Sequence, residues 1–243
     1  MMKNYLRIFG LLVAITVVFT ACKKESTTPA STGTPTPVSP AYSHVGLGDS
    51  NGVPSGTFIS LPSYISVVGN IVAAAPGGKS GSVPFKPYAT NNYIASDKGE
   101  YAPLGAGIIG INIAFKNSLN SPTSFTLPAG LLFIDDTIST DDTTRIPQHC
   151  FMLKNVQVNL GAGETVKVQV LTYCSNHHFS SPFGLNYQFG PVSNYPGLVE
   201  LTSIMKDKQH PVGQEWRMQT CVWDITNESG LTTDDRAFLN SLP

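Results

Sequence analysis

The chain contains little charge for its length. Charged residues make up 13% of its 243 positions, about half of the usual share in soluble proteins. Its 15 basic and 16 acidic residues nearly balance, and the basic ones form no stripe of the kind that contacts nucleic acid. We therefore expect no nucleic-acid partner. Glycine, proline, serine, threonine and asparagine fill the gap, which is typical of a secreted, β-rich protein with many turns.

The sequence also lacks the common signatures of catalysis. It contains no Gly-x-Ser-x-Gly elbow, no His-Glu-x-x-His zinc motif, no Walker loop and no Rossmann fingerprint. We therefore expect no cofactor and no enzymatic activity. A pair of separated carboxylates for glycoside hydrolysis would leave no signature in a sequence, so a hydrolase of that kind stays open.

One long apolar run is present, and it lies at the N-terminus. The run covers residues 8–19, which carry no charge, and the basic residues Lys3 and Arg7 lie before it. This is the pattern of a secretory signal, and the run is too short to span a bilayer comfortably. The residues "FTAC", which end at Cys22, resemble a bacterial lipobox, and this implies cleavage before Cys22 and a lipid on its sulfur. The alternatives are an ordinary signal peptide cleaved nearby and an uncleaved N-terminal anchor.

Residues 1–21 are thus expected to be a lipoprotein signal peptide, followed by a tether over residues 22–40. The tether is rich in Ser, Thr and Pro and has too little apolar surface to fold. Several acyl chains on one cysteine anchor a protein stably to a membrane. We therefore expect an exported protein that is lipid-anchored to the bacterial cell envelope. The lysines directly after Cys22 favour the outer membrane or the cell surface.

Residues 41–243 are expected to form the folded body, which is long enough for one large domain. Short apolar runs alternate with turn-rich segments, and residues 107–117 and 123–134 are typical of strands. The pattern predicts a mainly β fold. We expect an Ig-like antiparallel β-sandwich with two or three short C-terminal helices.

The strongest hairpin signal spans residues 150–174. Folding it symmetrically about Ala162 in a glycine-rich turn keeps alternate residues on one face of each strand. The register predicts these facing pairs: Val158 with Val166, Val156 with Val168, Leu153 with Leu171, Phe151 with Tyr173, and Cys150 with Cys174. A slip of one residue would abolish the pairing of the two cysteines.

The periodicity becomes helical after residue 195. Pro196 is suited to the first turn of a helix, and Thr232 with Asp235 forms a variant of the capping box. Between these two segments, the stretch "GQEWRMQTCVWDITN" is expected to be a helix. One face of that helix would carry Trp216, Gln219, Thr220 and Trp223.

The stretch "LTYCSNHHF" places Cys174 beside two histidines and leaves several interpretations of this cysteine open, an ordinary thiol without a covalent bond among them. Three cysteines follow Cys22, so at least one stays outside any internal disulfide. In the predicted register, an oxidising compartment would join Cys150 to Cys174. Cys221 would then be a buried thiol on a helix.

A metal site is an alternative interpretation of the same segment. Four ligands would converge at the strand ends to hold zinc: His149, Cys150, Cys174 and His177. The repeated spacing that is usual for zinc sites is absent, so exposed loop histidines are the simpler interpretation. We expect no resident metal.

A resemblance to a known family supplies the last interpretation. Tyr173-Cys174, followed later by Met218-Gln219-x-x-Val222-Trp223, resembles the two motifs of the thioester domains of bacterial surface adhesins. The resemblance implies that the Cys174 sulfur joins the side-chain carbonyl of Gln219 with loss of ammonia, leaving an acyl group that captures amines. Such a bond needs shielding from water and a proton carrier. The residues expected in these roles are Tyr173, Trp223, His177 and His178.

The expected function is that of a cell-envelope lipoprotein with a non-catalytic binding or adhesion role, directed at a protein or glycan surface. The sharper alternative is an internal-thioester module that covalently captures amines on a partner surface. A second alternative is a structural envelope protein stapled by a disulfide between Cys150 and Cys174.

Overall fold

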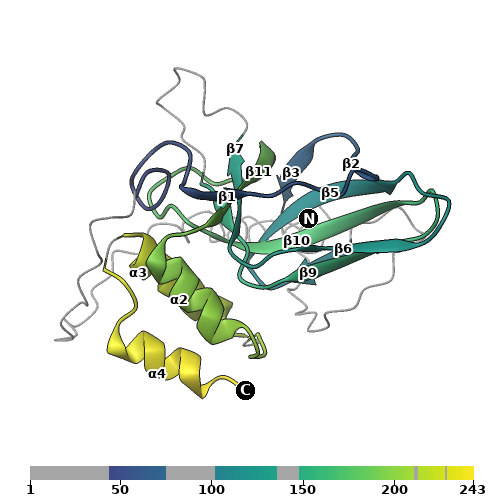
Figure 1. Cartoon of the computed structure of the whole chain (residues 1–243). Helices are drawn as coiled ribbons and strands as arrows, with labels where there is room; N and C mark the ends of the chain where they lie inside the picture. Colours follow the sequence, from purple (N-terminus) through teal and green to yellow (C-terminus); the bar gives the residue numbers. More distant parts are fainter. Residues whose placement is uncertain (1–43, 75–101, 136–147, 211–212, 228) are drawn as a thin grey trace, which may run out of the picture. The chain divides into compact units, whose positions relative to one another are not determined.

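A computed structural model of the chain describes residues 44–74, 102–135, 148–210, 213–227 and 229–243 (Figure 1). These residues all fall within one unit of the chain, residues 34–243. The predicted signal peptide, Cys22 and the predicted tether lie outside the described residues and stay predictions. Among the helices described, we find none with the length and hydropathy needed to cross a membrane.

The described residues form eleven strands: β1 (Gly56–Phe58), β2 (Ile65–Val67), β3 (Ile71–Ala74), β4 (Ala102–Gly105), β5 (Ile109–Asn117), β6 (Thr123–Leu127), β7 (Leu131–Asp135), β8 (Cys150–Phe151), β9 (Val156–Leu160), β10 (Thr165–Cys174) and β11 (Asn186–Ser193). Pairs between these strands are antiparallel except for β4 with β10. The expected mainly β, antiparallel class is therefore confirmed.

The larger sheet closes on itself. Strands β5, β3, β11, β7, β8 and β10 are hydrogen-bonded in this order, and β10 pairs with β5 again, which completes a six-stranded barrel. Strands β6 and β9 form a separate two-stranded sheet. Apolar side chains of this small sheet join those of the barrel in one core. Both sheets thus bury one common apolar interior, as a β fold of this size requires.

The predicted hairpin of residues 150–174 is wrong over most of its length. Val166 lies opposite a residue of β5 and Val158 opposite a residue of β6, so β10 and β9 belong to different sheets. Only the open end is as predicted, where β8 sets Cys150 opposite Cys174. The reason is burial. Strand β10 is buried on both faces along its second half, and the long apolar β5 covers more of it than β9, whose residues alternate between buried and exposed.

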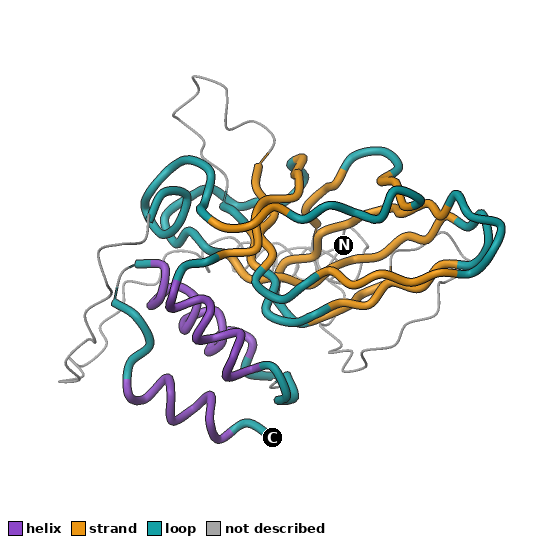
Figure 2. The backbone as a smooth tube through the Cα atoms, in the orientation of Figure 1, coloured by secondary structure: helices purple, strands orange, loops and turns teal. Residues whose placement is uncertain are grey.

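Three helices follow in the described C-terminal part: α2 (Pro196–Met205), α3 (Glu215–Thr226) and α4 (Thr233–Ser241). Figure 2 shows them gathered beside the strands. The sequence predicts all three, including Pro196 in the first turn of α2 and the capping box of Thr232 with Asp235. Their apolar faces form a second core with the side chains of β7, β8 and β10 that face away from the barrel interior, and this core fastens the helices to the outer face of these strands.

The predicted shared face of α3 is only partly right. Gln219 is fully buried and Trp223 is half-buried, whereas the side chain of Trp216 is 60% exposed. Gln219 and Trp223 lie one helical turn apart and face the strands together.

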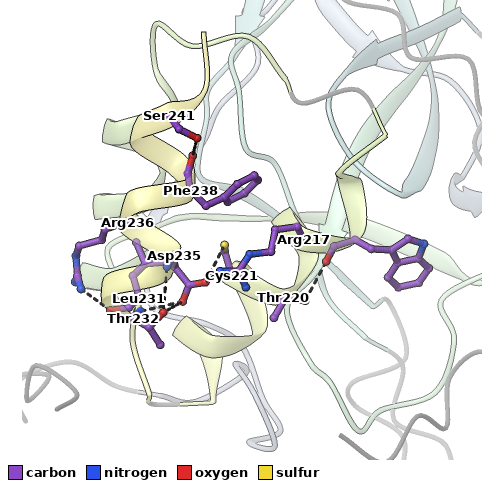
Figure 3. A network of polar contacts seen from close by, with 10 residues as sticks. Arg217, Thr220, Cys221, Leu231, Thr232, Asp235, Arg236, Phe238 and Ser241 are labelled. Atoms are coloured by element: carbon purple, nitrogen blue, oxygen red, sulfur yellow. Dashed lines mark hydrogen bonds and ion pairs between the residues drawn. The ribbon is translucent and has the colours of Figure 1, made fainter. Parts of the chain in front are cut away.

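Asp235 joins α3 to α4 (Figure 3). The backbone N–H of Thr232 donates to the carboxylate of Asp235 at 2.9 Å, and Nη2 of Arg217 lies 2.6 Å from Oδ1 of Asp235. The thiol of Cys221 donates to the same oxygen across 3.6 Å. Burial, followed by the charge of Asp235, raises the pKa of Cys221 to about 12, so this thiol stays protonated. Cys221 is therefore the buried helical thiol that the sequence predicts.

Asp235→Ala is expected to lower the free energy of unfolding by about 2–3 kcal/mol, because it removes a helix-cap partner and the ion-pair partner of Arg217. Asp235→Asn keeps an oxygen for the cap and should cost less. Urea unfolding of both variants measures this. A loss below about 0.5 kcal/mol for the alanine variant, as at an ordinary surface position, would contradict the role of Asp235.

Candidate functional site

Cys174 is the last residue of β10, and its two sides meet different partners. On one side β8 sets Cys150 opposite Cys174 and Phe151 opposite Tyr173. The N–H of Ser175 donates to the carbonyl of His149 at 2.9 Å, just outside the cysteine pair. The two cysteines therefore form a pair without hydrogen bonds between them, which is the closer of the two antiparallel spacings.

On its other side, Cys174 meets Gln219 of α3. The backbone N–H of Cys174 donates to Oε1 of Gln219 at 2.8 Å, and Nε2 of Gln219 donates to the carbonyl of Cys174 at 2.7 Å. Both residues are buried. Strand β5 pairs with β10 only as far as Thr172, and a primary amide carries the same donor and acceptor as a peptide group. The Gln219 side chain therefore continues the ladder where β5 ends.

The sulfur of Cys174 belongs to the barrel core. Alternate residues of a strand share a face, and Cys174 lies in the same core cluster as Val168 and Val170. Trp223 packs against this cluster. Tyr173 points to the opposite face, into the helical core, where its hydroxyl contacts Nε2 of His210. Of the two aromatics expected to shield Cys174, only Trp223 therefore packs on the sulfur's side of the strand.

The two predicted proton carriers lie on the outer side of Trp223. The ring of His177 meets the indole edge to face, with centroids 4.3 Å apart. Nδ1 of His177 is 3.3 Å from Nε2 of His178, which lies 3.8 Å from Oδ1 of Asp49. Partial burial, followed by the neighbouring His178, lowers the pKa of His177. His177 is therefore neutral at pH 7 and able to accept a proton.

The candidate metal set is not brought together. His149 is buried, its Nε2 is 3.0 Å from the carbonyl of Gly52, and burial lowers its pKa. His177 lies against Trp223 instead of the two cysteines. In the part of the chain that the structure describes, no group of three or more potential ligand side chains has metal-binding geometry. The proposed zinc ligands therefore fail on geometry, because His149 is directed away to the 44–52 loop.

The three described cysteines are buried thiols. Burial raises the pKa of Cys150 to about 12, against opposing hydrogen bonds from Thr172 and Tyr187. Cys150 therefore stays protonated at neutral pH, and a protonated thiol is a poor nucleophile.

Asn176 is a residue of this site that the sequence does not reveal. Its Oδ1 accepts from the N–H of His149 at 2.8 Å, and its Nδ2 donates to the carbonyls of Gly46 and Gly48. A Cβ on Gly48 would lie 2.2 Å from the carbonyl oxygen of Thr226, so this loop packs tightly on the end of α3. Asn176 thus fastens the 44–52 loop beside Cys174 and α3. A lone asparagine in a polar loop carries no signal of such a role.

Acid is expected to weaken the fold through His210. Burial lowers its pKa to about 4, against an opposing attraction from Glu215. The unfolded chain therefore binds the proton more tightly. Stability should be complete above about pH 6.5 and fall as pH drops towards 4, by on the order of 2 kcal/mol. His149 acts in the same direction.

Thermal unfolding between these pH values tests the effect, with His210→Gln as the variant and His178→Gln, at an exposed histidine, as the control. The acid-induced drop should shrink in the first variant and persist in the second. An equal drop in all three proteins would contradict the assignment to His210.

Comparisons of the chain with family models, with curated proteins and with solved structures find no match. The site is accordingly interpreted from its own geometry: a mainly β domain holds a buried cysteine and a buried glutamine side by side, beneath a tryptophan and a histidine.

Proposed function

We propose that this chain is an exported lipoprotein, lipidated at Cys22, whose folded body serves binding or adhesion at the cell envelope. We further propose that its specific device is an internal thioester between Sγ of Cys174 and Cδ of Gln219. One observation carries the proposal: the Gln219 side-chain amide is held through both its oxygen and its nitrogen against the residue whose thiol would attack it.

The hydrogen bonds suit the reaction. When the sulfur attacks Cδ, the electron pair of the carbonyl moves to Oε1, which already accepts the N–H of Cys174. Such a donor stabilises the oxyanion of acyl transfer. Nε2, which already donates to the Cys174 carbonyl, leaves as ammonia with the thiol proton. A thiol and an amide thus give a thioester and ammonia, and a later amine gives a new amide and releases the thiol.

The surroundings support the same proposal. Trp223 covers the core that contains Cys174, which would limit hydrolysis. The neutral His177 on the outer side of Trp223 would take the proton of an attacking amine. A lysine side chain on a protein surface is the amine that such a site would meet. Reversible binding of a protein or glycan surface is the non-covalent form of the same role.

A second candidate function rests on the register of β8 and β10. Cys150 and Cys174 face one another as a close antiparallel pair, as a structural staple would require. The protein would then be a structural envelope lipoprotein. The finer fold assignment, an Ig-like β-sandwich, also stays a proposal, supported by the β6–β9 sheet that packs over the core of the larger sheet.

The intact mass of the full chain, before and after methylamine, separates these functions. A deficit of one ammonia that methylamine replaces with its own mass supports the thioester. A deficit of two hydrogens that a reductant restores supports the disulfide staple. An unmodified mass with three reactive thiols after denaturation rules out both bonds and leaves reversible binding.

A further inference from the structure

The indole N–H of Trp223 is a buried donor with no hydrogen-bond acceptor among the residues that the structure describes. Buried donors are nearly always bonded, and an unsatisfied one costs about 1–3 kcal/mol. A donor kept in this state needs an explanation, and functional sites are where such groups are found.

The position of Trp223 connects it to the reacting atoms. It follows Gln219 by one turn of α3, so the two side chains leave the helix on the same face. Its ring packs against the cluster that contains Cys174 on one side and meets the ring of His177 on another. The indole is therefore held in place beside the Cys174–Gln219 contact by two independent packing interactions.

The acyl oxygen of that contact needs more donors during the reaction than it has at rest. In the resting amide, Oε1 of Gln219 accepts the backbone N–H of Cys174. Attack by sulfur, or later by an amine, breaks the π bond of the carbonyl and places a full negative charge on this oxygen. A carbonyl oxygen has two lone pairs, and an oxyanion is stabilised by donors prepared in advance.

We propose that the indole N–H of Trp223 is the second donor to this oxygen, so that Trp223 is a catalytic residue of thioester formation and of amine capture. The inference rests on the proposed thioester. In the resting amide the donor is unused, and in the tetrahedral intermediate it binds the oxygen together with the N–H of Cys174. Collapse of the intermediate returns the electron pair to the carbonyl and expels ammonia or the Cys174 thiolate.

This role and a purely shielding role predict opposite results. Trp223→Phe keeps an aromatic ring and removes the N–H. Loss of an oxyanion donor should slow methylamine capture and spontaneous hydrolysis alike, by about 100-fold. A tryptophan that only excludes water would, when reduced to a smaller ring, let hydrolysis accelerate.

The experiment uses the full chain purified in detergent and follows methylamine capture and hydrolysis by intact mass. Each rate is divided by the number of molecules that carry the thioester. Trp216→Phe, at the exposed tryptophan of the same helix, is the matched control and should behave as wild type. Trp223→His keeps a ring N–H and should recover part of the lost rate. Thermal melting reports whether each variant folds.

Slow capture and slow hydrolysis in Trp223→Phe, with partial recovery in Trp223→His, support the proposal. Unchanged rates or faster hydrolysis in Trp223→Phe overturn it. An equal loss of rate in Trp223→Phe and Trp223→His also overturns it, even where both variants melt at a lower temperature. A wild-type chain without the ammonia deficit overturns the thioester itself, and this inference with it. A wild-type deficit combined with unchanged variant rates overturns only the role of Trp223.

Discussion

Gln219→Ala is expected to abolish amine capture and to lower the free energy of unfolding by about 3 kcal/mol. The chemistry is lost because the variant has no side-chain carbonyl to acylate. The stability is lost because the backbone N–H of Cys174 loses its buried acceptor, and in molecules that still carry the amide the carbonyl of Cys174 loses its donor as well. Methylamine incorporation, read by mass, and urea unfolding measure the two effects on the same sample.

Cys174→Ala separates the two roles of this contact. Both hydrogen bonds join the Gln219 side chain to the backbone of Cys174, and the Cys174 side chain takes part in neither, so the alanine variant keeps them. We expect complete loss of capture with a cost in stability of only about 1 kcal/mol, from the small cavity. A Gln219 variant as stable as wild type would contradict the structural role, whatever the chemistry shows.

Amine capture is expected to open Cys174 to oxidation. While the thioester exists, its sulfur is bonded to Gln219 and cannot join Cys150. Capture releases the thiol opposite Cys150, at the close antiparallel spacing. Methylamine-treated protein should therefore gain a deficit of two hydrogens in oxidised glutathione, whereas untreated protein should not. The exchange proceeds through a mixed disulfide and runs faster at alkaline pH, because the attacking species is a thiolate.

Cys150→Ser is the matched control for this result. It should capture methylamine at the wild-type rate, since Cys150 is a buried, protonated thiol on the neighbouring strand and takes no part in the acyl transfer. It should then fail to form the internal bond and carry glutathione instead. Equal oxidation of treated and untreated wild-type protein would show that no acyl bond protects Cys174.

Local patterns predicted the parts of this fold that local forces decide. Pro196 begins α2 because its missing N–H costs nothing in the first turn, and Thr232 caps α4 because its side chain and that of Asp235 satisfy the first backbone donors. The facing of Cys150 and Cys174 was also predicted, although the strand that carries Cys150 pairs there over only two residues.

The pairing of β9 was predicted wrongly because it depends on strands that are distant in the sequence and not on neighbouring residues. A glycine-rich turn between two alternating strands is equally compatible with a hairpin and with a connection between two sheets. Which of these forms depends on the competing partners β5 and β6, which lie far away in the sequence. The rejected zinc set failed in the same way, because the direction of His149 is set by the distant Gly52.

Local sequence patterns were enough to predict the strands between residues 107 and 174, the three helices and the residues with reactive chemistry, because propensity, capping and alternation act over a few neighbouring positions. Through a resemblance the sequence also singled out Cys174 and Gln219 as partners. How they meet depends on contacts between distant segments: β5 ends at the residue opposite Thr172, and the backbone groups of Cys174 beyond it take their hydrogen bonds from α3. The cost of leaving buried backbone groups unpaired is a long-range constraint, and it is this constraint that holds the Gln219 amide beside Cys174.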